Sequence, residues 1–248
     1  MNDFAGLTVM NTGAAGGIGK AIAECFAATG ARLALVDMHD PSELASRLGA
    51  DHKGFVLDLE DAGAIASVVD QIGAAMGIDI LINNAGLGIV FPAEEPNFEV
   101  WDKTMRINLR DPWLVAAAAL PYLKASGRGR VINISSQAGV IAIEEHAAYD
   151  ASKAGLINLA KVMAVEWAKF GITANAIAPT VVETPMALVG WSGKREKGPE
   201  EISLSGALPS LAKSPRRRAA SPLRRPESLT GRSQWPMAAS ASNRSPHF

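Results

Sequence analysis

Tyr149 and Lys153 are the residues of this 248-residue chain whose types and spacing most directly suggest proton transfer. Four residues apart, they would share one face of a helix, with the ammonium group near the phenol. A phenol with an ordinary pKa near about 10 is a poor base at neutral pH, and a neighbouring cation favours the phenolate. The pair therefore predicts a general base toward an alcohol, or a general acid toward a ketone, at Tyr149.

Ser136 is placed to hydrogen-bond the substrate oxygen in such a reaction. It follows the apolar run 131–134, so it would lie where a strand ends, thirteen residues before Tyr149. A hydroxyl group there can hold and polarise an alcohol or carbonyl oxygen. Each residue also has an ordinary structural interpretation: packing for Tyr149, a solvated charge for Lys153 and a cap for Ser136. Their combination favours the catalytic interpretation.

A glycine-rich turn over residues 12–19 indicates a binding site for a phosphate group. It follows the first β-rich run and opens a helical stretch at 20–28. Glycines permit a tight turn and close approach of the backbone to a pyrophosphate, and a helix N-terminus offers free N–H groups. Taken by itself, such a turn is equally compatible with an ordinary loop. The predicted contacts are Gly13, Gly17, Ile18 and Gly19.

Asp37 ends the second β-rich run, 18 residues after the last glycine of the turn. In a dinucleotide site, an acidic residue close to this position accepts hydrogen bonds from the adenosine ribose. A carboxylate there would repel the 2′-phosphate of NADP, and Met38 and His39 supply no Arg or Lys to bind one. We therefore predict NAD as the cofactor, with NADP less favoured. The alternative is that Asp37 simply begins a turn with Asp40 and Pro41.

The elements that must position these residues alternate along the chain. Short β-rich runs occur at 7–11, 32–36, 54–57, 80–82, 130–134 and 173–177, and helical stretches begin near residues 17, 62, 98 and 149. This alternation is typical of βαβ units. We predict an α/β fold, a single-domain doubly wound parallel sheet with helices on both faces.

The composition is that of a globular protein. Apolar residues make up 48% of the chain, and the single Cys25 can form no internal disulfide and has no cluster of metal ligands around it. Residues 1–20 lack the basic start and apolar stretch of a signal peptide. The apolar run 113–120, bounded by prolines, is far shorter than the roughly 20 residues of a membrane span. We expect a cytoplasmic protein without a metal site or a membrane partner.

Further motifs carry a resemblance to a known family. The segment 83–86 reads Asn-Asn-Ala-Gly after the fourth β-rich run, and a helical position further on is Asn108. With the glycine turn and the residues above, this set resembles the short-chain dehydrogenase/reductase family over residues 6–186. The resemblance implies a Rossmann-like fold and NAD-dependent hydride transfer between a secondary alcohol and a ketone. The implied catalytic set is Asn108, Ser136, Tyr149 and Lys153.

The resemblance also implies roles in cofactor binding. Lys153 would bind the nicotinamide ribose together with Tyr149, and Asn108 would hold a water that relays protons from Lys153. The other implied contacts are Asp58 and Leu59 at the adenine, Asn84, Ala85 and Gly86 along the ribose, and Pro179, Val182 and Thr184 around the nicotinamide amide. The partner would be a small alcohol or ketone, with no nucleic acid, and the family forms homodimers and homotetramers.

Two departures from the family pattern carry information. Thr180 replaces the usual glycine, and the run 179–184 resembles xylulose reductases and polyol dehydrogenases, which implies a sugar alcohol or keto sugar as substrate. Reduction of a 3-oxoacyl thioester is the alternative. Asn11 is polar where the first strand is normally apolar, so we expect it to weaken packing beneath the phosphate turn.

Residues 194–248 differ in composition from the rest of the chain. They hold 11 Lys and Arg against 4 Asp and Glu, whereas residues 1–193 hold 13 against 21, and they contain seven of the fourteen prolines. We therefore divide the chain into a dinucleotide-binding domain at 1–193 and a basic tail at 194–248, which the composition predicts to be disordered or non-native. An arginine-rich arm for nucleic acid is the less favoured interpretation.

The tail reads as an out-of-frame translation. Codons taken from their third nucleotide permit Val-Ala-Asp-Gly-Gly-Phe over residues 234–240, and a segment of that kind ends the family's sequences. We infer a frameshift between about residues 191 and 203. The fold would then lack its last strand, or have it replaced, which leaves open an NAD-binding but catalytically disabled remnant and puts the oligomer in question.

Overall fold

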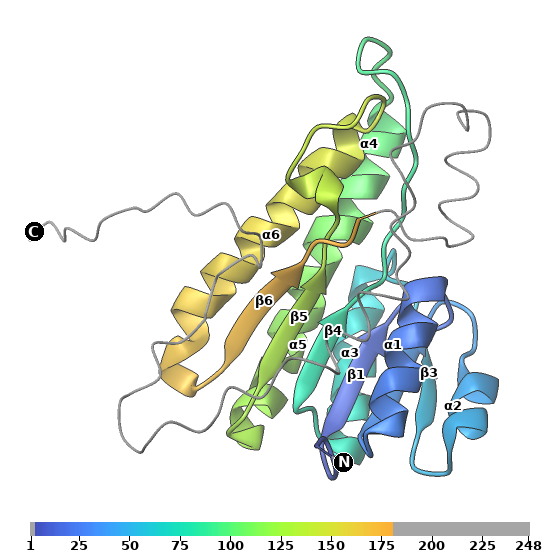
Figure 1. Cartoon of the computed structure of the whole chain (residues 1–248), viewed down its shortest axis with the longest axis vertical. Helices are drawn as coiled ribbons and strands as arrows, with labels where there is room; N and C mark the ends of the chain where they lie inside the picture. The colour runs from blue at the N-terminus through green and yellow to red at the C-terminus, as the bar shows by residue number, and fades with distance from the viewer. Residues whose placement is uncertain (1–2, 181–248) are drawn as a thin grey trace, which may run out of the picture.

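The computed structural model describes residues 3–180, which form a six-stranded, wholly parallel sheet with helices on both faces (Figure 1). The strand order is β3-β2-β1-β4-β5-β6. The predicted α/β fold is confirmed. The predicted boundary at residue 193, the predicted tail, and two predicted cofactor contacts, Val182 and Thr184, lie outside the described residues. The strands are β1 Thr8–Thr12, β2 Arg32–Asp37, β3 Lys53–Val56, β4 Ile80–Asn83, β5 Arg130–Ile134 and β6 Thr173–Ile177.

The order of the strands in the sheet determines where a ligand can bind. After β1, the chain adds β2 and β3 on one side and then returns to place β4, β5 and β6 on the other. The direction reverses between β1 and β4. In open parallel sheets, ligands bind in the crevice beyond the carboxyl ends of the strands at this switch point.

The helices cover the two faces in separate groups. On one face, α1 and α2 pack against the sheet through residues such as Ile22 and Ala45. On the other, α3, α5 and α6 bury the larger apolar cluster, which includes Ile72, Leu123 and Trp167. The helical elements are α1 Gly17–Ala28, α2 Ser42–Leu48, α3 Ala62–Met76, α4 Phe98–Met105, the π-helix η1 Arg106–Arg110, α5 Asp111–Ser126, the 3₁₀ turns η2 Gln137–Gly139 and η3 Ala168–Phe170, and α6 Ala147–Trp167.

The sequence pattern located most element boundaries to within two residues. The four consecutive buried residues at 33–36 in β2 are the continuous apolar run expected of a central parallel strand. Helix α6 begins at Ala147 rather than near Tyr149. Pro112 lies in the first turn of α5, where proline is tolerated. Pro121 lies inside α5 and does not end the helix, although proline usually disrupts a helix interior. Within residues 3–180, no helix combines the length and apolar character of a membrane span.

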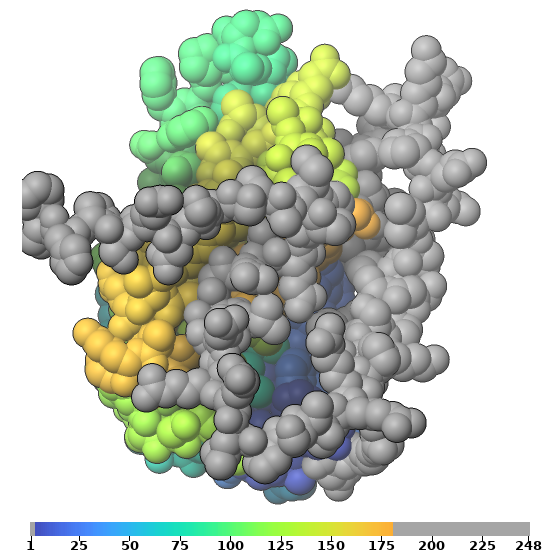
Figure 2. Space-filling model, turned by 60° about the vertical axis from the view of Figure 1, so that its left-hand side comes forward, coloured from blue at the N-terminus to red at the C-terminus, as the bar shows by residue number. Residues whose placement is uncertain are grey.

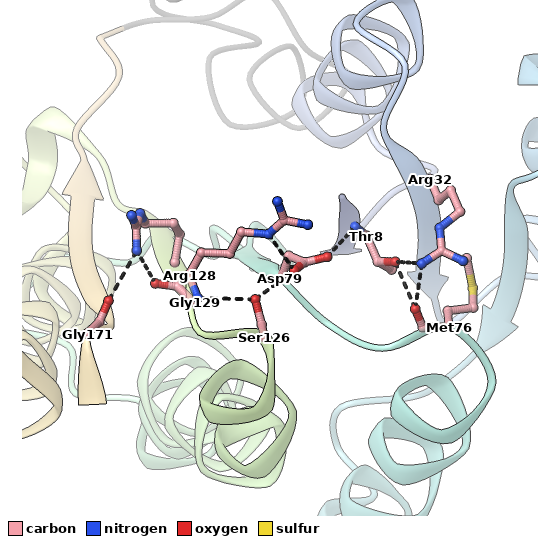
Figure 3. Close-up of polar contacts among 9 residues, drawn as sticks. Thr8, Arg32, Met76, Asp79, Ser126, Arg128, Gly129 and Gly171 are labelled. Atoms are coloured by element: carbon pink, nitrogen blue, oxygen red, sulfur yellow. Dashed lines mark hydrogen bonds and ion pairs between the residues drawn. The ribbon is translucent and has the colours of Figure 1, made fainter. Parts of the chain in front are cut away.

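The amino ends of the strands are joined by a chain of polar contacts (Figure 3). Asp79, just before β4, accepts hydrogen bonds from the Thr8 backbone N–H at 2.8 Å, the Ser126 hydroxyl at 2.6 Å and Arg128 Nε at 3.2 Å. Arg32 donates to Thr8 Oγ1 and to the Met76 carbonyl oxygen. One carboxylate thus connects β1, β4 and the loop before β5 at the end of the sheet opposite the ligand crevice.

Asp79→Asn is expected to destabilise the fold in a pH-dependent way. Burial opposes ionisation of Asp79, but the hydrogen bonds from Ser126, Thr8 and Arg128 outweigh it and hold the pKa of this carboxyl below its ordinary value. The stabilisation is therefore full above about pH 4, the ordinary Asp range, and is lost as the pH falls through the lower folded-state pKa. We expect a loss of about 1–3 kcal/mol at neutral pH by denaturant unfolding.

The exposed Asp51 provides the matched control for this substitution. Asp51→Asn should leave the free energy of unfolding within about 0.5 kcal/mol of the parent chain, as is usual for surface changes. A difference between Asp79→Asn and the parent that stayed the same from neutral to strongly acid pH would contradict the role given to the Asp79 charge.

Candidate active site

A cleft of about 640 Å³ lies at the carboxyl ends of β1, β2, β3, β4 and β5, where the strand order reverses. The glycine turn and Asp37 line it at one end, and Ser135, Tyr149 and Lys153 line it at the other. Its volume is in the range typical of cofactor sites. The cleft brings together residues that the sequence separates by more than a hundred positions.

The glycine turn packs so closely against β4 that side chains are excluded. Gly13 has a φ of +65°, and a Cβ atom there would lie 2.7 Å from the Ala85 Cα atom. A Cβ on Gly19 would collide with the Gly13 carbonyl oxygen. The Asn84 side chain donates to the carbonyl oxygens of Thr12 and Gly13, both at 3.0 Å. The turn is therefore held open toward the cleft with its backbone exposed to a ligand.

Asn11 joins β1 to the first turn of α1. Its side chain is fully buried, and its Nδ2 atom donates to the Gly19 carbonyl oxygen at 2.9 Å. Its Oδ1 atom has no hydrogen-bond partner within residues 3–180. The expectation that Asn11 only weakens packing beneath the turn was therefore incomplete, because half of the amide forms a specific contact that fixes Gly19.

Asp37 lies at the end of β2 with its carboxylate at the rim of the cleft. Its Oδ2 atom accepts from the Ala15 N–H at 2.9 Å, so the carboxylate also steadies the glycine turn. Its Oδ1 atom accepts from the His39 N–H at 3.1 Å. This second contact is the turn that the alternative interpretation anticipated, and it coexists with the position at the cleft.

Tyr149 and Lys153 share one face of α6, as their spacing predicted. The Lys153 Nζ atom is 5.6 Å from the centroid of the Tyr149 ring and donates to the Ile134 carbonyl oxygen at 3.0 Å. Lys153 is only 4% exposed, and burial lowers the pKa of its ammonium group to about 8. The carbonyl oxygen of the same residue accepts from the Ser135 hydroxyl at 2.8 Å.

The electrostatics at Tyr149 include effects that residue spacing alone does not predict. Burial raises the pKa of the phenol above its ordinary value, a hydrogen bond with Ser136 lowers it, and the Asp150 carboxylate raises it again. The sequence-based argument considered the Lys153 cation, which favours the phenolate, and did not include burial of the phenol. Desolvation of the phenol is the larger effect, and the Lys153 ammonium is directed at the Ile134 carbonyl oxygen.

Asn108 lies in the π-helix η1, between α4 and α5. Its side chain is fully buried and bonds both backbone groups of Leu87 at 2.8 Å, and it also donates to the Ser152 hydroxyl at 3.1 Å. Asn108 therefore links η1, the segment after β4 and α6. Single π-turns inside helices are frequent at functional sites.

The remaining predicted contacts lie around the same cleft. Gly17, Ile18, Asp58, Leu59, Asn84, Ala85 and Gly86 line it. Pro179 follows β6 and accepts from the Gln137 N–H at 2.8 Å, so it lies beside the start of the loop after Ser136. A Cβ on Gly86 would approach the Asn108 Oδ1 atom and the Lys153 Nζ atom at 3.1 and 3.3 Å.

A second group of residues lines the cleft and was not predicted from the sequence. Glu60 and Lys103 form a 2.9 Å ion pair at the rim, next to Asp58 and Leu59. Ile107, one helical turn after Lys103, lines the cleft as well. The four-residue spacing of Lys103 and Ile107 places them on one face of the helical segment, which was a usable signal. Within residues 3–180, no group of three or more His, Cys, Asp or Glu side chains is placed to hold a metal ion.

A comparison with protein families identifies this arrangement. The family model for short chain dehydrogenases matches residues 7–192. The chain belongs to the short-chain dehydrogenase/reductase family. Its glycine turn, its Asn84–Gly86 segment and its Tyr149–Lys153 pair all fall within the matched residues.

Individual short-chain dehydrogenases similar to this one act on alcohols. A D-threitol dehydrogenase from Mycolicibacterium smegmatis is 41% identical over 196 residues, covering 77% of this chain and 75% of the relative. An NAD-dependent glycerol dehydrogenase from Listeria innocua is 40% identical over 186 residues, covering 74% and 73%. This short-chain dehydrogenase is accordingly an oxidoreductase that acts on CH–OH groups.

A solved structure shows the same fold with a cofactor. A protein from Beutenbergia cavernae, described as an NAD(P)-dependent gluconate 5-dehydrogenase with bound NADP at low occupancy, is similar with a TM-score of 0.74 and 32% identity. The similarity covers 78% of this chain and 79% of that chain. The family binds NAD(P), and the absence of room for side chains at Gly13 and Gly19 in this short-chain dehydrogenase fits a dinucleotide lying against the turn.

Gly13→Ala is expected to weaken NADH binding at least about tenfold, because the left-handed backbone alone costs a side chain about 1–2 kcal/mol. The contact with Ala85 adds to this cost. Gly16→Ala is the matched control, since a Cβ there would only meet the Gly13 carbonyl oxygen at an ordinary 3.5 Å. Fluorescence titration of both variants with NADH is the measurement. Equal affinities would show that the close approach at Gly13 does not shape the binding surface.

Proposed function

We propose that this short-chain dehydrogenase oxidises a polyol or sugar alcohol at a secondary alcohol, and reduces the matching ketone, with NAD as cofactor. The observation that carries the proposal is the hydrogen bond between Ser136 and the half-buried Tyr149, which lines one end of a cleft that has a carboxylate, Asp37, at the other. The threitol and glycerol dehydrogenases similar to this chain support a polyol as the substrate.

Tyr149 and Ser136 act on the substrate oxygen in the proposed reaction. In oxidation, the O–H proton passes to Tyr149 while the Ser136 hydroxyl holds the oxygen as it becomes a carbonyl oxygen. In reduction, Tyr149 returns the proton. Bound NAD supplies the acceptor for the hydride that leaves the carbinol carbon and, in its oxidised form, a positive charge that favours the phenolate. Because burial raises the pKa of Tyr149, oxidation should become faster as the pH rises.

Lys153 and Asn108 would complete the proton route. We propose that Lys153 binds the nicotinamide ribose and passes protons to a water held by Asn108. The Asn108 amide bonds Leu87 and Ser152, and these contacts fix its position next to α6. A Lys153 pKa of about 8 suits proton exchange near neutral pH.

The preference for NAD rests on the charges around Asp37. No arginine is among the described residues that line the cleft, and Lys103, which lies at the rim near Asp58 and Leu59, is paired with Glu60. A 2′-phosphate would therefore meet the Asp37 carboxylate with only His39 beside it. The glycerol dehydrogenase from Listeria innocua is NAD-dependent, which supports NAD, and parallel titrations with NADH and NADPH test the preference.

Other parts of the proposal concern the setting of the enzyme. We propose Pro179, Val182 and Thr184 as the neighbours of the nicotinamide amide, and a cytoplasmic homodimer or homotetramer as the working form. A panel of polyols, keto sugars and a 3-oxoacyl thioester, each with NAD(H), tests the substrate. Turnover of the thioester alone would replace the polyol proposal, and NADH binding without any turnover would identify a disabled remnant.

Tyr149→Phe is expected to lower kcat at least about 100-fold, because it removes the acid and base while keeping the ring. NADH binding should stay within about threefold of the parent value, since the phenyl ring still fills its place. Steady-state kinetics and an NADH titration on the same preparation measure both. Persistent turnover in this variant would show that the base is a different group.

Asp37→Ala is expected to weaken NADH binding and to reduce the preference of the enzyme for NADH over NADPH. Loss of one hydrogen-bonding charge costs about 1.5–3 kcal/mol, roughly a ten- to hundredfold change. Parallel titrations with NADH and NADPH give the ratio. Asp40→Ala, which changes an exposed carboxylate next in the same turn, is the control. An unchanged ratio in Asp37→Ala would return this residue to a purely local role in the turn.

A further inference from the structure

Ser136 and Tyr149 are joined by a loop over residues 137–148 that lies at the carboxyl edge of the sheet (Figure 1). The loop begins with the turn η2 and ends in the first residues of α6. Val140 and Ile141 are 45% and 53% exposed, so apolar side chains lie on its surface. Because the loop joins Ser136 to Tyr149, a substrate held by both residues would lie beside it.

Asp150 connects this loop to α6 one residue after the catalytic tyrosine. Its Oδ2 atom accepts a hydrogen bond from the Ile143 N–H at 2.8 Å. Its Oδ1 atom is buried and has no hydrogen-bond partner within the described residues. A carboxylate that is partly buried and bonded to one backbone N–H of a loop is suited to fix that loop.

The segment fixed by Asp150 is tightly folded and carries a ring against Tyr149. The His146 ring meets the Tyr149 ring edge to face, with centroids 6.0 Å apart, and its Nδ1 atom is 2.6 Å from the Glu144 carbonyl oxygen. The Glu145 carbonyl oxygen accepts from the Phe91 N–H at 2.8 Å. In Figures 1 and 2, the loop and the segment after β4 lie together at the upper end of the molecule.

We propose that Asp150 is a positioning residue for the substrate. Asp150 holds residues 140–146 against the start of α6 and so fixes the position of the loop beside Tyr149 and Ser136. The inference rests on the proposed function, because it needs a substrate at these two residues. It assigns to Asp150 no contact with NAD, since Asp150 does not line the cofactor cleft.

The charge of Asp150 gives the proposal a second observable. Among the described residues, the charged or titratable groups facing Tyr149 are Asp150, Lys153 and His146. After burial and the Ser136 hydrogen bond, the Asp150 carboxylate raises the pKa of Tyr149. Removing this charge should therefore move the acid limb of the pH profile for oxidation to lower pH.

A pair of substitutions separates the hydrogen bond from the charge. Asp150→Asn keeps an oxygen that can accept from Ile143 N–H and removes the charge, whereas Asp150→Ala removes both. We expect Asp150→Ala to raise the substrate KM about tenfold, with Asp150→Asn within about threefold of the parent chain. Both variants should shift the acid limb to lower pH, and neither should change the NADH Kd by more than about twofold.

Glu166→Gln is the matched control, because it removes a carboxylate from an exposed position at the other end of α6. It should change neither the KM nor the pH profile. If the Asp150 carboxylate merely stabilised the N-terminus of α6, both Asp150 variants would lose thermal stability equally. The substrate KM would then not change separately from the NADH Kd. That pattern, or an unchanged acid limb, would overturn the proposal.

Hydrogen exchange makes the test independent of turnover. The amides of residues 140–146 should exchange faster in Asp150→Ala than in Asp150→Asn or the parent chain, while the amides of the glycine turn stay unchanged. Equal exchange in all three proteins would overturn the proposal. If the parent chain turns over no substrate but the loop exchanges as expected, the proposed function fails and the attachment of the loop by Asp150 stands.

Discussion

The contact between the glycine turn and the carboxyl end of β4 is the constraint on which the site depends. At Gly13 the backbone of the turn approaches Ala85 so closely that no Cβ fits, and Asn84 bonds the carbonyl oxygens on the turn side. Thr12 Oγ1 accepts from the N–H groups of Asn84 and Ala85 in return. These contacts lock β1 to β4 at the point where the strand order reverses, and the cleft exists because that junction is rigid.

Buried polar groups extend this rigidity to the catalytic end. Asn108 bonds Leu87 on the β4 side and Ser152 on α6, while Lys153 bonds the end of β5. The same burial has an electrostatic consequence, because it raises the pKa of Tyr149 above its ordinary value and lowers that of Lys153 to about 8. Both shifts favour the uncharged form of the side chain, as desolvation does for any buried ionisable group.

The sequence predicted what depends on residue type and short spacing, and it failed where tertiary context decides. The strands, the glycine turn and the shared face of Tyr149 and Lys153 follow from local pattern and were confirmed as structure. The π-turn at Asn108 and the contact of Asn11 with Gly19 depend on neighbours distant from any local pattern. The direction of the pKa shift at Tyr149 could not be predicted from spacing, because burial is its largest cause and burial is a property of the whole fold.

Backbone atoms shape one end of the cleft and side chains shape the other, so the two ends differ in which substitutions they can accept. At the cofactor end the shape comes from the backbone, so a side chain at Gly13 or Gly19 disturbs the turn itself. At the substrate end a loop is fixed in part by a side chain, Asp150, and carries its own exposed apolar residues. Residues of the loop can therefore vary without altering the turn, so one cofactor scaffold can serve alcohols of different shape. Substrate choice in this chain should follow the loop and its attachment rather than the sheet.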